Sequence, residues 1–201
     1  MAEWPANDVT AFVLAGGKSS RMGRDKAMLP WKNETLLTLT RKVAEEVAET
    51  VRIVGQMEKL SRFGQVVEDT FRECGPLGGI QAALASSSTE LNLVLAVDMP
   101  FLKADFLEYL ILAARESQAM VTVPRTHGRW QTLCAVYRKE FGELATRSLR
   151  DGKNKIDSLF ASVTLRVIEE EELVRGRFSA DIFRNLNTPE DLKNAERVGQ
   201  K

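Results

Sequence analysis

Nearly continuous apolar runs alternate along the chain with segments whose apolar residues recur every three or four positions. The runs at 9–14 and 91–97 predict central strands covered on both faces. Shorter runs predict further strands at 51–54, 65–68, 120–123, 130–137 and 163–168. Helical spacing predicts helices at 34–49, 80–85, 104–116 and 141–149, and a threonine cap followed by proline predicts another from residue 188.

This order of elements predicts an α/β fold: one Rossmann-like domain over residues 1–201, with a mostly parallel sheet between helical layers. Ligands of such sheets bind beyond the carboxyl ends of the strands. The loop after the first strand, Asp69 and Asp98 each follow a predicted strand directly. We therefore expect them to meet at one edge of the sheet.

Composition narrows the possible partners. The 28 basic and 28 acidic residues cancel, which argues against a nucleic-acid or membrane binder. No secretory signal is visible at the N-terminus, and no apolar run approaches the ~20 residues that span a bilayer. Cys74 and Cys134 form no C-x-x-C pattern, so neither a zinc site nor a disulfide framework is indicated. We expect both thiols to be reduced and the protein to be cytoplasmic.

Positive charge gathers instead in the loop after the first strand. This loop holds three glycines and four cations: Gly16, Gly17, Gly23, Lys18, Arg21, Arg24 and Lys26. Glycines let backbone N–H groups close around an anion, and cations neutralise it. A Walker loop is excluded because Phe12 stands where its first glycine is required, and the glycine spacing also fails the G-x-G-x-x-G fingerprint. A phosphate cradle of another kind is indicated, with an ordinary basic surface turn as the alternative.

The loop resembles the signature of nucleotidyltransferases that attach a nucleoside monophosphate to a phosphorylated acceptor. The matching residues are Leu14, Ala15, Gly16, Gly17, Ser20, Arg21, Met22, Gly23, Lys26, Leu29 and Pro30. Within these enzymes the chain is most similar to the molybdenum cofactor guanylyltransferases of the molybdopterin nucleotidyltransferase family. Segments 68–69, 75–79 and 185–192 carry the narrower resemblance, and segment 97–100 extends it. It spans nearly the whole chain in the expected order.

The resemblance implies the fold of the nucleotide-diphospho-sugar transferases and a Mg²⁺-dependent transfer of GMP. GTP would donate the nucleotide to the terminal phosphate of molybdopterin, with or without its metal, and pyrophosphate would leave. The product would be the guanine dinucleotide form of the cofactor. Other expected partners are transient ones, namely proteins of cofactor biosynthesis or the recipient molybdoenzymes.

The resemblance also assigns roles to individual residues. Lys26, Asp98 and Arg21 are the expected catalytic residues, and Asp98 is the expected magnesium ligand. The nucleotide would be bound by Leu14, Ala15, Gly16, Gly17, Lys26, Asp69, Gly78 and Asp98. The acceptor would be bound by Asn185 and Asn187.

Several of the polar candidate residues also have a purely structural interpretation. Asp98 could cap the following helix, Asp69 could cap a turn, and the asparagines could form Asx turns. Lys18 and Arg24 are as consistent with solvated surface charges as with ligands. His127 lies in a Thr-His-Gly-Arg turn, which favours a surface histidine without a catalytic role.

Three rival functions share parts of this pattern. A cytidylyltransferase for molybdopterin and a sugar-phosphate nucleotidyltransferase would use the same chemistry on another substrate. Gly16, where alanine is the alternative, favours the guanylyl branch, whereas Val54-Gly55-Gln56 lacks asparagines that we associate with it. A non-catalytic nucleotide-binding regulator would have no need to retain both Lys26 and Asp98.

Overall fold

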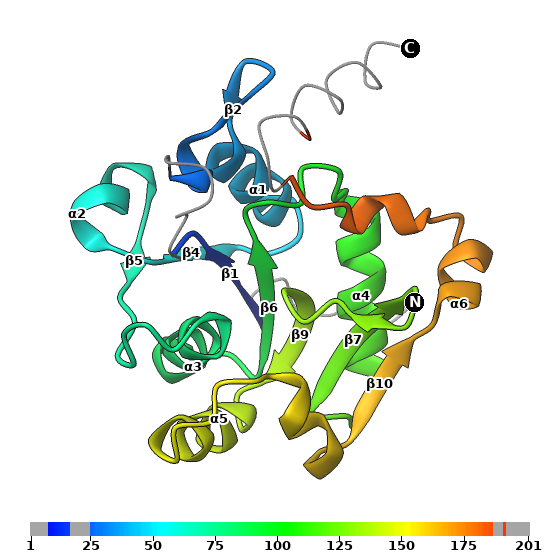
Figure 1. Cartoon of the computed structure of the whole chain (residues 1–201). Coiled ribbons are helices and arrows are strands. Elements are labelled where there is room, and N and C mark those ends of the chain that lie inside the picture. Colours follow the sequence, from blue (N-terminus) through cyan, green and yellow to red (C-terminus); the bar gives the residue numbers. More distant parts are fainter. Residues whose placement is uncertain (1–7, 17–24, 187–190, 192–201) are drawn as a thin grey trace.

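The fold is built on one large mixed sheet (Figure 1). The structure is a computed structural model that describes residues 8–16, 25–186 and 191. The strands lie in the order β10 (Leu165–Ile168), β7 (Val121–Thr126), β9 (Cys134–Arg138), β6 (Leu91–Ala96), β1 (Val9–Leu14), β4 (Thr50–Val54) and β5 (Val66–Val67). Within this order only β9 runs antiparallel to its neighbours. The predicted α/β fold with a mostly parallel sheet is confirmed.

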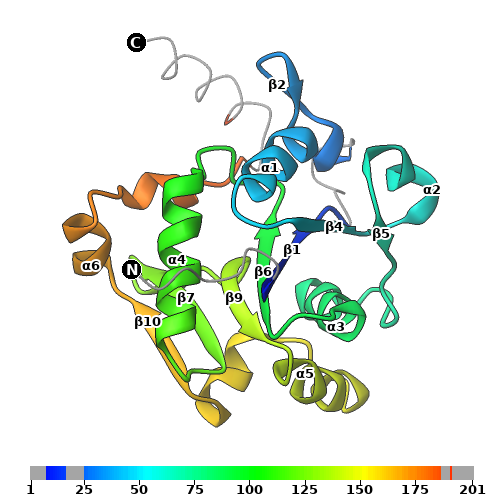
Figure 2. The same ribbon diagram turned by 180° about the vertical axis from the view of Figure 1, so that it is seen from behind.

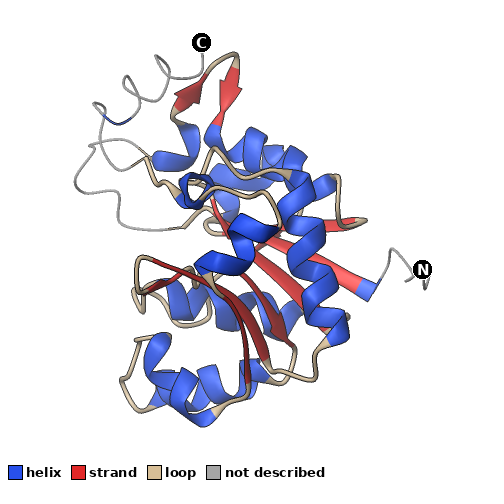
Figure 3. Cartoon of the chain, turned by 90° about the vertical axis from the view of Figure 1, so that its right-hand side faces the viewer, coloured by secondary structure: helices blue, strands red, loops and turns tan. Residues whose placement is uncertain are grey.

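Two pairs of long helices cover the sheet, one pair on each face (Figures 2 and 3). Helices α1 (Leu36–Glu45) and α4 (Ala104–Glu116) pack on one face, and α3 (Pro76–Ser86) and α5 (Phe141–Arg150) pack on the other. Because side chains alternate along a strand, β1 contributes to both cores. Every residue of β1 is buried, as its apolar sequence predicts.

The first predicted helix is shorter than expected. Instead of 34–49, α1 covers Leu36–Glu45, and its start is fixed by Thr35, whose side-chain oxygen accepts the N–H of Thr38 at 3.2 Å. The residues before it form a small hairpin of β2 (Pro30–Trp31) and β3 (Glu34–Thr35). The helical spacing of apolar residues continues across this cap, so nothing in the apolar pattern indicates the hairpin.

The strand predicted over 130–137 is in fact two strands. β8 (Arg129–Trp130) forms a hairpin with β7, and β9 begins only at Cys134. His127 and Gly128 connect β7 and β8 with positive φ angles of 49° and 72°, as a tight two-residue turn requires. The last predicted strand is likewise shorter and covers Leu165–Ile168.

Several other boundaries differ from the prediction. α3 begins at Pro76, so Gly78 and Gly79 lie in its first turn and not in a turn before it. The short helices α2 (Met57–Leu60) and α6 (Glu170–Arg175) have no counterpart in the predicted set, nor do the 3-10 turns Lys26–Met28, Ser61–Phe63, Asp157–Ser162 and Ala180–Phe183. The helix predicted from residue 188 lies outside the described residues. None of the helices described in the structure is long and apolar enough to cross a membrane.

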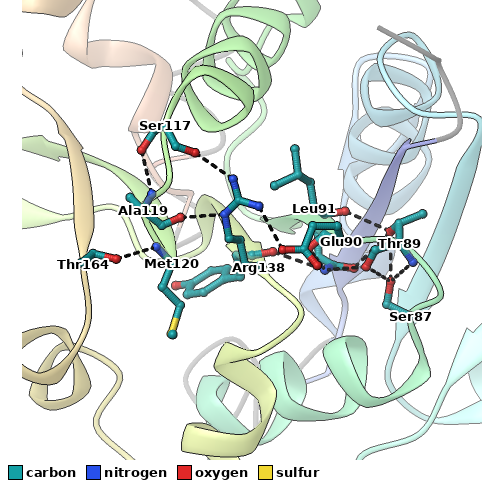
Figure 4. Close-up of polar contacts among 11 residues, drawn as sticks. Ser87, Thr89, Glu90, Leu91, Ser117, Ala119, Met120, Arg138 and Thr164 are labelled. Carbon is teal, nitrogen blue, oxygen red and sulfur yellow. Dashed lines mark hydrogen bonds and ion pairs between the residues drawn. The ribbon is translucent and has the colours of Figure 1, made fainter.

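A polar network around Arg138 ties together the loops at the amino end of β6 (Figure 4). The guanidinium donates to the backbone carbonyls of Ala119 at 3.1 Å and Ser117 at 2.7 Å. It also pairs with the Glu90 carboxylate at 2.9 Å. The Arg138 side chain is only 17% exposed, so it provides these carbonyls with a donor that water replaces poorly.

We expect Arg138→Ala to destabilise the fold by about 2 kcal/mol, because it removes several charge-assisted hydrogen bonds at once. The urea midpoint of unfolding measures this change. Arg150→Ala is the matched control, since Arg150 is an exposed arginine at the end of α5. Equal midpoints for the two variants would contradict the role given to Arg138.

Candidate active site

The predicted site residues gather at the carboxyl ends of four parallel strands. Pairing places Leu14, Val54, Val67 and Ala96 in one row across β1, β4, β5 and β6. Gly16, Asp69 and Asp98 each follow a member of this row by two positions. The convergence expected from the sequence is therefore present in the sheet register.

Close backbone contacts join the ends of β1, β4 and β5 at this edge. The N–H of Ala15 donates to Val54 O at 2.9 Å, and the N–H of Gly55 donates to Val67 O at 2.9 Å. A Cβ built on Gly16 would lie 3.5 Å from the Cα of Gly55. That distance is ordinary contact, whereas a Cβ on Gly55 would lie 2.6 Å from Leu60 Cδ1 and 3.3 Å from Gly16 N, so Gly55 is the position where a larger residue would force the neighbours to shift. Gly55 entered the sequence analysis only as a departure from the guanylyl pattern, and its contact with Gly16 was not foreseen.

Gly78 and Gly79 have different surroundings. A Cβ on Gly78 would lie 2.8 Å from the carbonyl oxygen of Phe71, so glycine is required there by the chain segment that precedes α3. A Cβ on Gly79 would lie 3.1 Å from Leu14 Cδ2 and 3.7 Å from Asp69 Oδ1. Gly79, rather than Gly78, is the glycine that faces the loop after β1.

Asp69 lies between the loop after β1 and the first turn of α3. Its Oδ1 is buried and has no hydrogen-bond partner among the described residues. Burial raises the pKa of its carboxyl group above the usual value, because the charged form is poorly solvated. A buried acceptor without a donor costs stability, and a ligand with N–H or O–H groups can supply the missing donor.

Lys26 and Asp98 form the charged centre of the edge. Lys26 Nζ lies 3.2 Å from Asp98 Oδ2, and both side chains are largely shielded from solvent. Lys26 begins the 3-10 turn Lys26–Met28, which Asp25 caps by accepting the N–H of Ala27 at 3.1 Å. Asp25 was not among the residues that the sequence singled out, and its capping role was not foreseen. Asp98 does not cap the next helix, since Lys103 occupies that position before α4.

The segment expected to bind the acceptor also reaches this centre. The N–H of Leu186 donates to the backbone carbonyl of Asp98 at 2.9 Å. Leu186 itself is buried in a small apolar cluster with Leu29 and Trp31. Asn185 is exposed and directly precedes this anchor. Asn187, Gly17, Lys18, Arg21 and Arg24 lie outside the described residues.

His127 lies at the tip of the β7–β8 hairpin, and its side chain is 77% exposed. Its backbone N–H donates to Glu170 Oε2 at 3.0 Å, and its Nδ1 lies 3.7 Å from the other oxygen of that carboxylate. The expected surface location is confirmed. The sequence had given this histidine no partner, and the structure identifies Glu170 as one.

The donor set suits a magnesium ion shared with a substrate better than a preformed protein site. Across residues 8–16, 25–186 and 191, no three His, Cys, Asp or Glu side chains gather as metal ligands would. Mg²⁺ commonly takes one or two carboxylates and completes its shell with waters and substrate phosphates. The Asp98 carboxylate, partly exposed beside Lys26, fits that arrangement.

Both cysteines are free thiols, as expected.

Comparison with known proteins agrees with this geometry. The family model of the MobA-like NTP transferase domain matches residues 11–167. A probable molybdenum cofactor guanylyltransferase of Pelotomaculum thermopropionicum is 38% identical over 192 residues, covering 92% of this chain and 91% of the relative. A second protein of that description, from Carboxydothermus hydrogenoformans, is 32% identical and covers 95% of this chain and 96% of its own.

Solved structures extend the comparison. Molybdopterin-guanine dinucleotide biosynthesis protein A from Archaeoglobus fulgidus aligns with a TM-score of 0.84 and 27% identity, over 95% of this chain and 98% of its own. CMP:2-keto-3-deoxy-manno-octonic acid synthetase aligns with a TM-score of 0.73 at 11% identity, over 96% of this chain and 99% of its own, which shows the shared fold alone. The chain belongs to the family of MobA-like NTP transferase domains.

Proposed function

We propose that the protein transfers GMP from GTP to the terminal phosphate of molybdopterin, with or without its metal, and releases pyrophosphate. The observation that carries this proposal is the Lys26–Asp98 pair at the sheet edge, together with Asp69, whose buried Oδ1 has no donor among the described residues. The names of the relatives and of the Archaeoglobus structure support the choice of base and acceptor.

The proposed binding residues divide between two substrates. GTP is bound by Leu14, Ala15, Gly16, Gly17, Lys26, Asp69, Gly78 and Asp98. Gly78 contributes through the first turn of α3, where it lets the Phe71 carbonyl approach closely. The acceptor is bound by Asn185 and Asn187, of which Asn185 adjoins the anchor at Leu186.

The chemistry requires positioning and charge neutralisation more than proton transfer. An oxygen of the acceptor phosphate bonds to the α-phosphorus of GTP, and the bond from that phosphorus to the bridging oxygen breaks. A phosphate monoester is largely dianionic at neutral pH, since its second pKa is near ~6, so the acceptor needs no general base. Lys26 and Arg21 offset negative charge on the leaving pyrophosphate. The exposed His127 has no part in this scheme.

Asp98 is the proposed ligand of Mg²⁺. When bound, the ion would neutralise phosphate charge and orient the reacting groups. Lys26 contacts the same carboxylate, so it holds Asp98 in place before substrate arrives. We further propose a cytoplasmic enzyme of one domain over residues 1–201, with transient contacts to cofactor-biosynthesis proteins or recipient molybdoenzymes.

Nucleotide binding tests the proposed base. Isothermal titration with GTP, CTP, ATP and UTP, each with and without Mg²⁺, should give the tightest binding for GTP with the ion present. Turnover of GTP with molybdopterin, followed as pyrophosphate release, then tests the reaction. Tighter binding and faster turnover of CTP would assign the protein to the cytidylyl branch. Binding of GTP without turnover of any phosphorylated acceptor would favour a nucleotide-binding regulator.

Asp98→Asn should lower kcat by ~10² or more and leave the fold intact, because a neutral amide is a poor magnesium ligand. Steady-state pyrophosphate release measures the loss, and circular dichroism checks the fold. His127→Ala serves as the control, since an ionised acceptor phosphate needs no base. The mechanism is wrong if His127→Ala abolishes turnover while Asp98→Asn remains active.

Asp69→Asn should weaken GTP binding by about ten- to hundredfold, the value of a hydrogen bond to a charged group. Titrations with inosine triphosphate and 2′-deoxy-GTP identify the partner, because the substitution should not weaken the analogue that lacks the contacted group.

The same substitution should stabilise the free protein at neutral pH. Burial raises the pKa of Asp69 in the folded state, so the wild type loses stability as pH rises above the carboxyl's ordinary value of 3.8 and the group ionises. Asn does not ionise, so the advantage of the variant in Tm should vanish in acid. An Asp69→Asn protein that binds GTP normally would remove this residue from the site.

A further inference from the structure

The Lys26–Asp98 pair joins two backbone segments that are held in different ways. Asp98 follows the end of β6 by two positions, and its backbone carbonyl accepts the N–H of Leu186 at 2.9 Å. The aspartate is therefore fixed by a central strand and by a second contact. Lys26 belongs instead to the short 3-10 turn Lys26–Met28, outside the sheet. Its placement is the less constrained of the two.

The ion pair by itself is too weak to place the lysine. Lys26 Nζ lies 3.2 Å from Asp98 Oδ2, and the two side chains are 26% and 17% exposed. Ion pairs in contact with water contribute little, because holding long side chains in one geometry costs rotamer entropy. Lysine carries its charge on a flexible aliphatic stem. Nζ therefore stays beside Asp98 only if the backbone of Lys26 is already held in place.

The turn is held at its C-terminal end by packing. The N–H of Leu29 donates to Lys26 O at 3.1 Å, and the Leu29 carbonyl accepts the N–H of Leu36 at 3.0 Å. Leu29 and Leu36 are buried in one apolar cluster with Leu186. This end of the turn is therefore attached to α1 and to the segment that contacts the backbone of Asp98.

Asp25 holds the other end of the turn. Its Oδ1 accepts the N–H of Ala27 at 3.1 Å, and its backbone carbonyl accepts the N–H of Met28 at 3.0 Å. Ala27 is fully buried, so water would replace a lost acceptor poorly. A short 3-10 helix has few backbone hydrogen bonds of its own, so its cap is a large share of what holds it. Lys26 lies between the two residues of this cap.

We propose that Asp25 is a positioning residue of the transfer reaction, which acts by holding Lys26 beside Asp98 through its cap on Ala27. This inference rests on the proposed function, in which Lys26 offsets negative charge on the leaving pyrophosphate. The role requires a hydrogen-bond acceptor at Asp25 and not its charge. A metal ligand at the same position would require the charge, so the two roles can be separated.

The first test compares Asp25→Ala with Asp25→Asn, by initial rates of pyrophosphate release with molybdopterin and magnesium GTP. Loss of one cap hydrogen bond should lower the kcat of the alanine variant about tenfold. Asparagine caps as well as aspartate, so Asp25→Asn should stay within about threefold of wild type. The KM for molybdopterin should change by less than about twofold in both variants. Asp157→Ala, at an exposed aspartate that begins another 3-10 helix, is the matched control.

A double-mutant cycle tests whether Asp25 acts through Lys26. Asp25→Ala should lower kcat in the wild-type background but not in a Lys26→Ala background, because no amine is then left to position. An aspartate that only stabilised the fold would lower turnover by a similar factor in both backgrounds. That result, or an asparagine variant as slow as the alanine variant, would overturn the inference.

Chemical labelling decides the same question without turnover. Limited acetylation by an N-hydroxysuccinimide ester, followed by mass spectrometry, measures how readily each lysine amine reacts. Relative to exposed Lys59, Lys26 should react several-fold faster in Asp25→Ala and at the wild-type rate in Asp25→Asn. An unchanged rate in Asp25→Ala would contradict the positioning role. Failure of the proposed function would instead appear as a wild type that does not turn over molybdopterin, and the labelling rates would still decide what holds Lys26.

Discussion

The register of β1 between β4 and β6 is the constraint on which the rest of the site depends. Leu14 pairs with Val54 on one side and with Ala96 on the other. A slip of one residue would move the loop after β1 by about 3.3 Å and turn every side chain of the strand to the opposite face. β1 is buried on both faces, so such a slip would also disrupt both cores. Hydrophobic packing therefore sets the distances between groups that are themselves polar.

The polar groups at this edge reduce the stability of the fold. One oxygen of the Asp69 carboxylate, Oδ1, is buried without a donor from the described residues, and partial burial raises the pKa of the group. Lys26 and Asp98 partly compensate each other, but the pair remains accessible at the carboxyl end of β6. At the opposite edge the polar groups around Arg138 satisfy one another. The two edges differ in this respect as a binding edge requires, because a polar group that already has its hydrogen-bond partners within the protein gains little by binding a ligand.

The sequence predicted the elements whose patterns extend over whole segments. The strand at Val9–Leu14 and the helix at Ala104–Glu116 agree with the predicted 9–14 and 104–116. Prediction failed where two short elements share one apolar stretch. The run 130–137 contains a hairpin strand, a turn and β9, and composition alone does not mark the break between them. The cap at Thr35 was missed because the apolar pattern continues across it, and the start of α3 at Pro76 was missed because Gly78 and Gly79 are typical of a turn.

For the site, residue types at strand ends were enough to predict that Lys26, Asp69 and Asp98 converge, since all parallel strands of a sheet end at one edge. Contacts between loops required the structure, as the approach of Gly55 to Gly16 shows. The direction of β9 was also not predicted from the sequence. Strand–helix alternation indicates parallel pairing, whereas β9 reverses direction and places the turn before it at the carboxyl edge.

That reversal determines what lies at the carboxyl edge on the far side of β6. A parallel strand in the place of β9 would begin at the amino edge and present a loop that leads into a helix. An antiparallel strand instead begins at the carboxyl edge, so the turn that enters it lies at the same edge of the sheet as Asp98. Here that turn is fixed by Pro124 and Thr126 of β7 and by Tyr137 of β9 itself. One half of the edge is thus formed by the loops that follow parallel strands, and the other by a turn that hydrogen bonds to β7 and β9 hold in place.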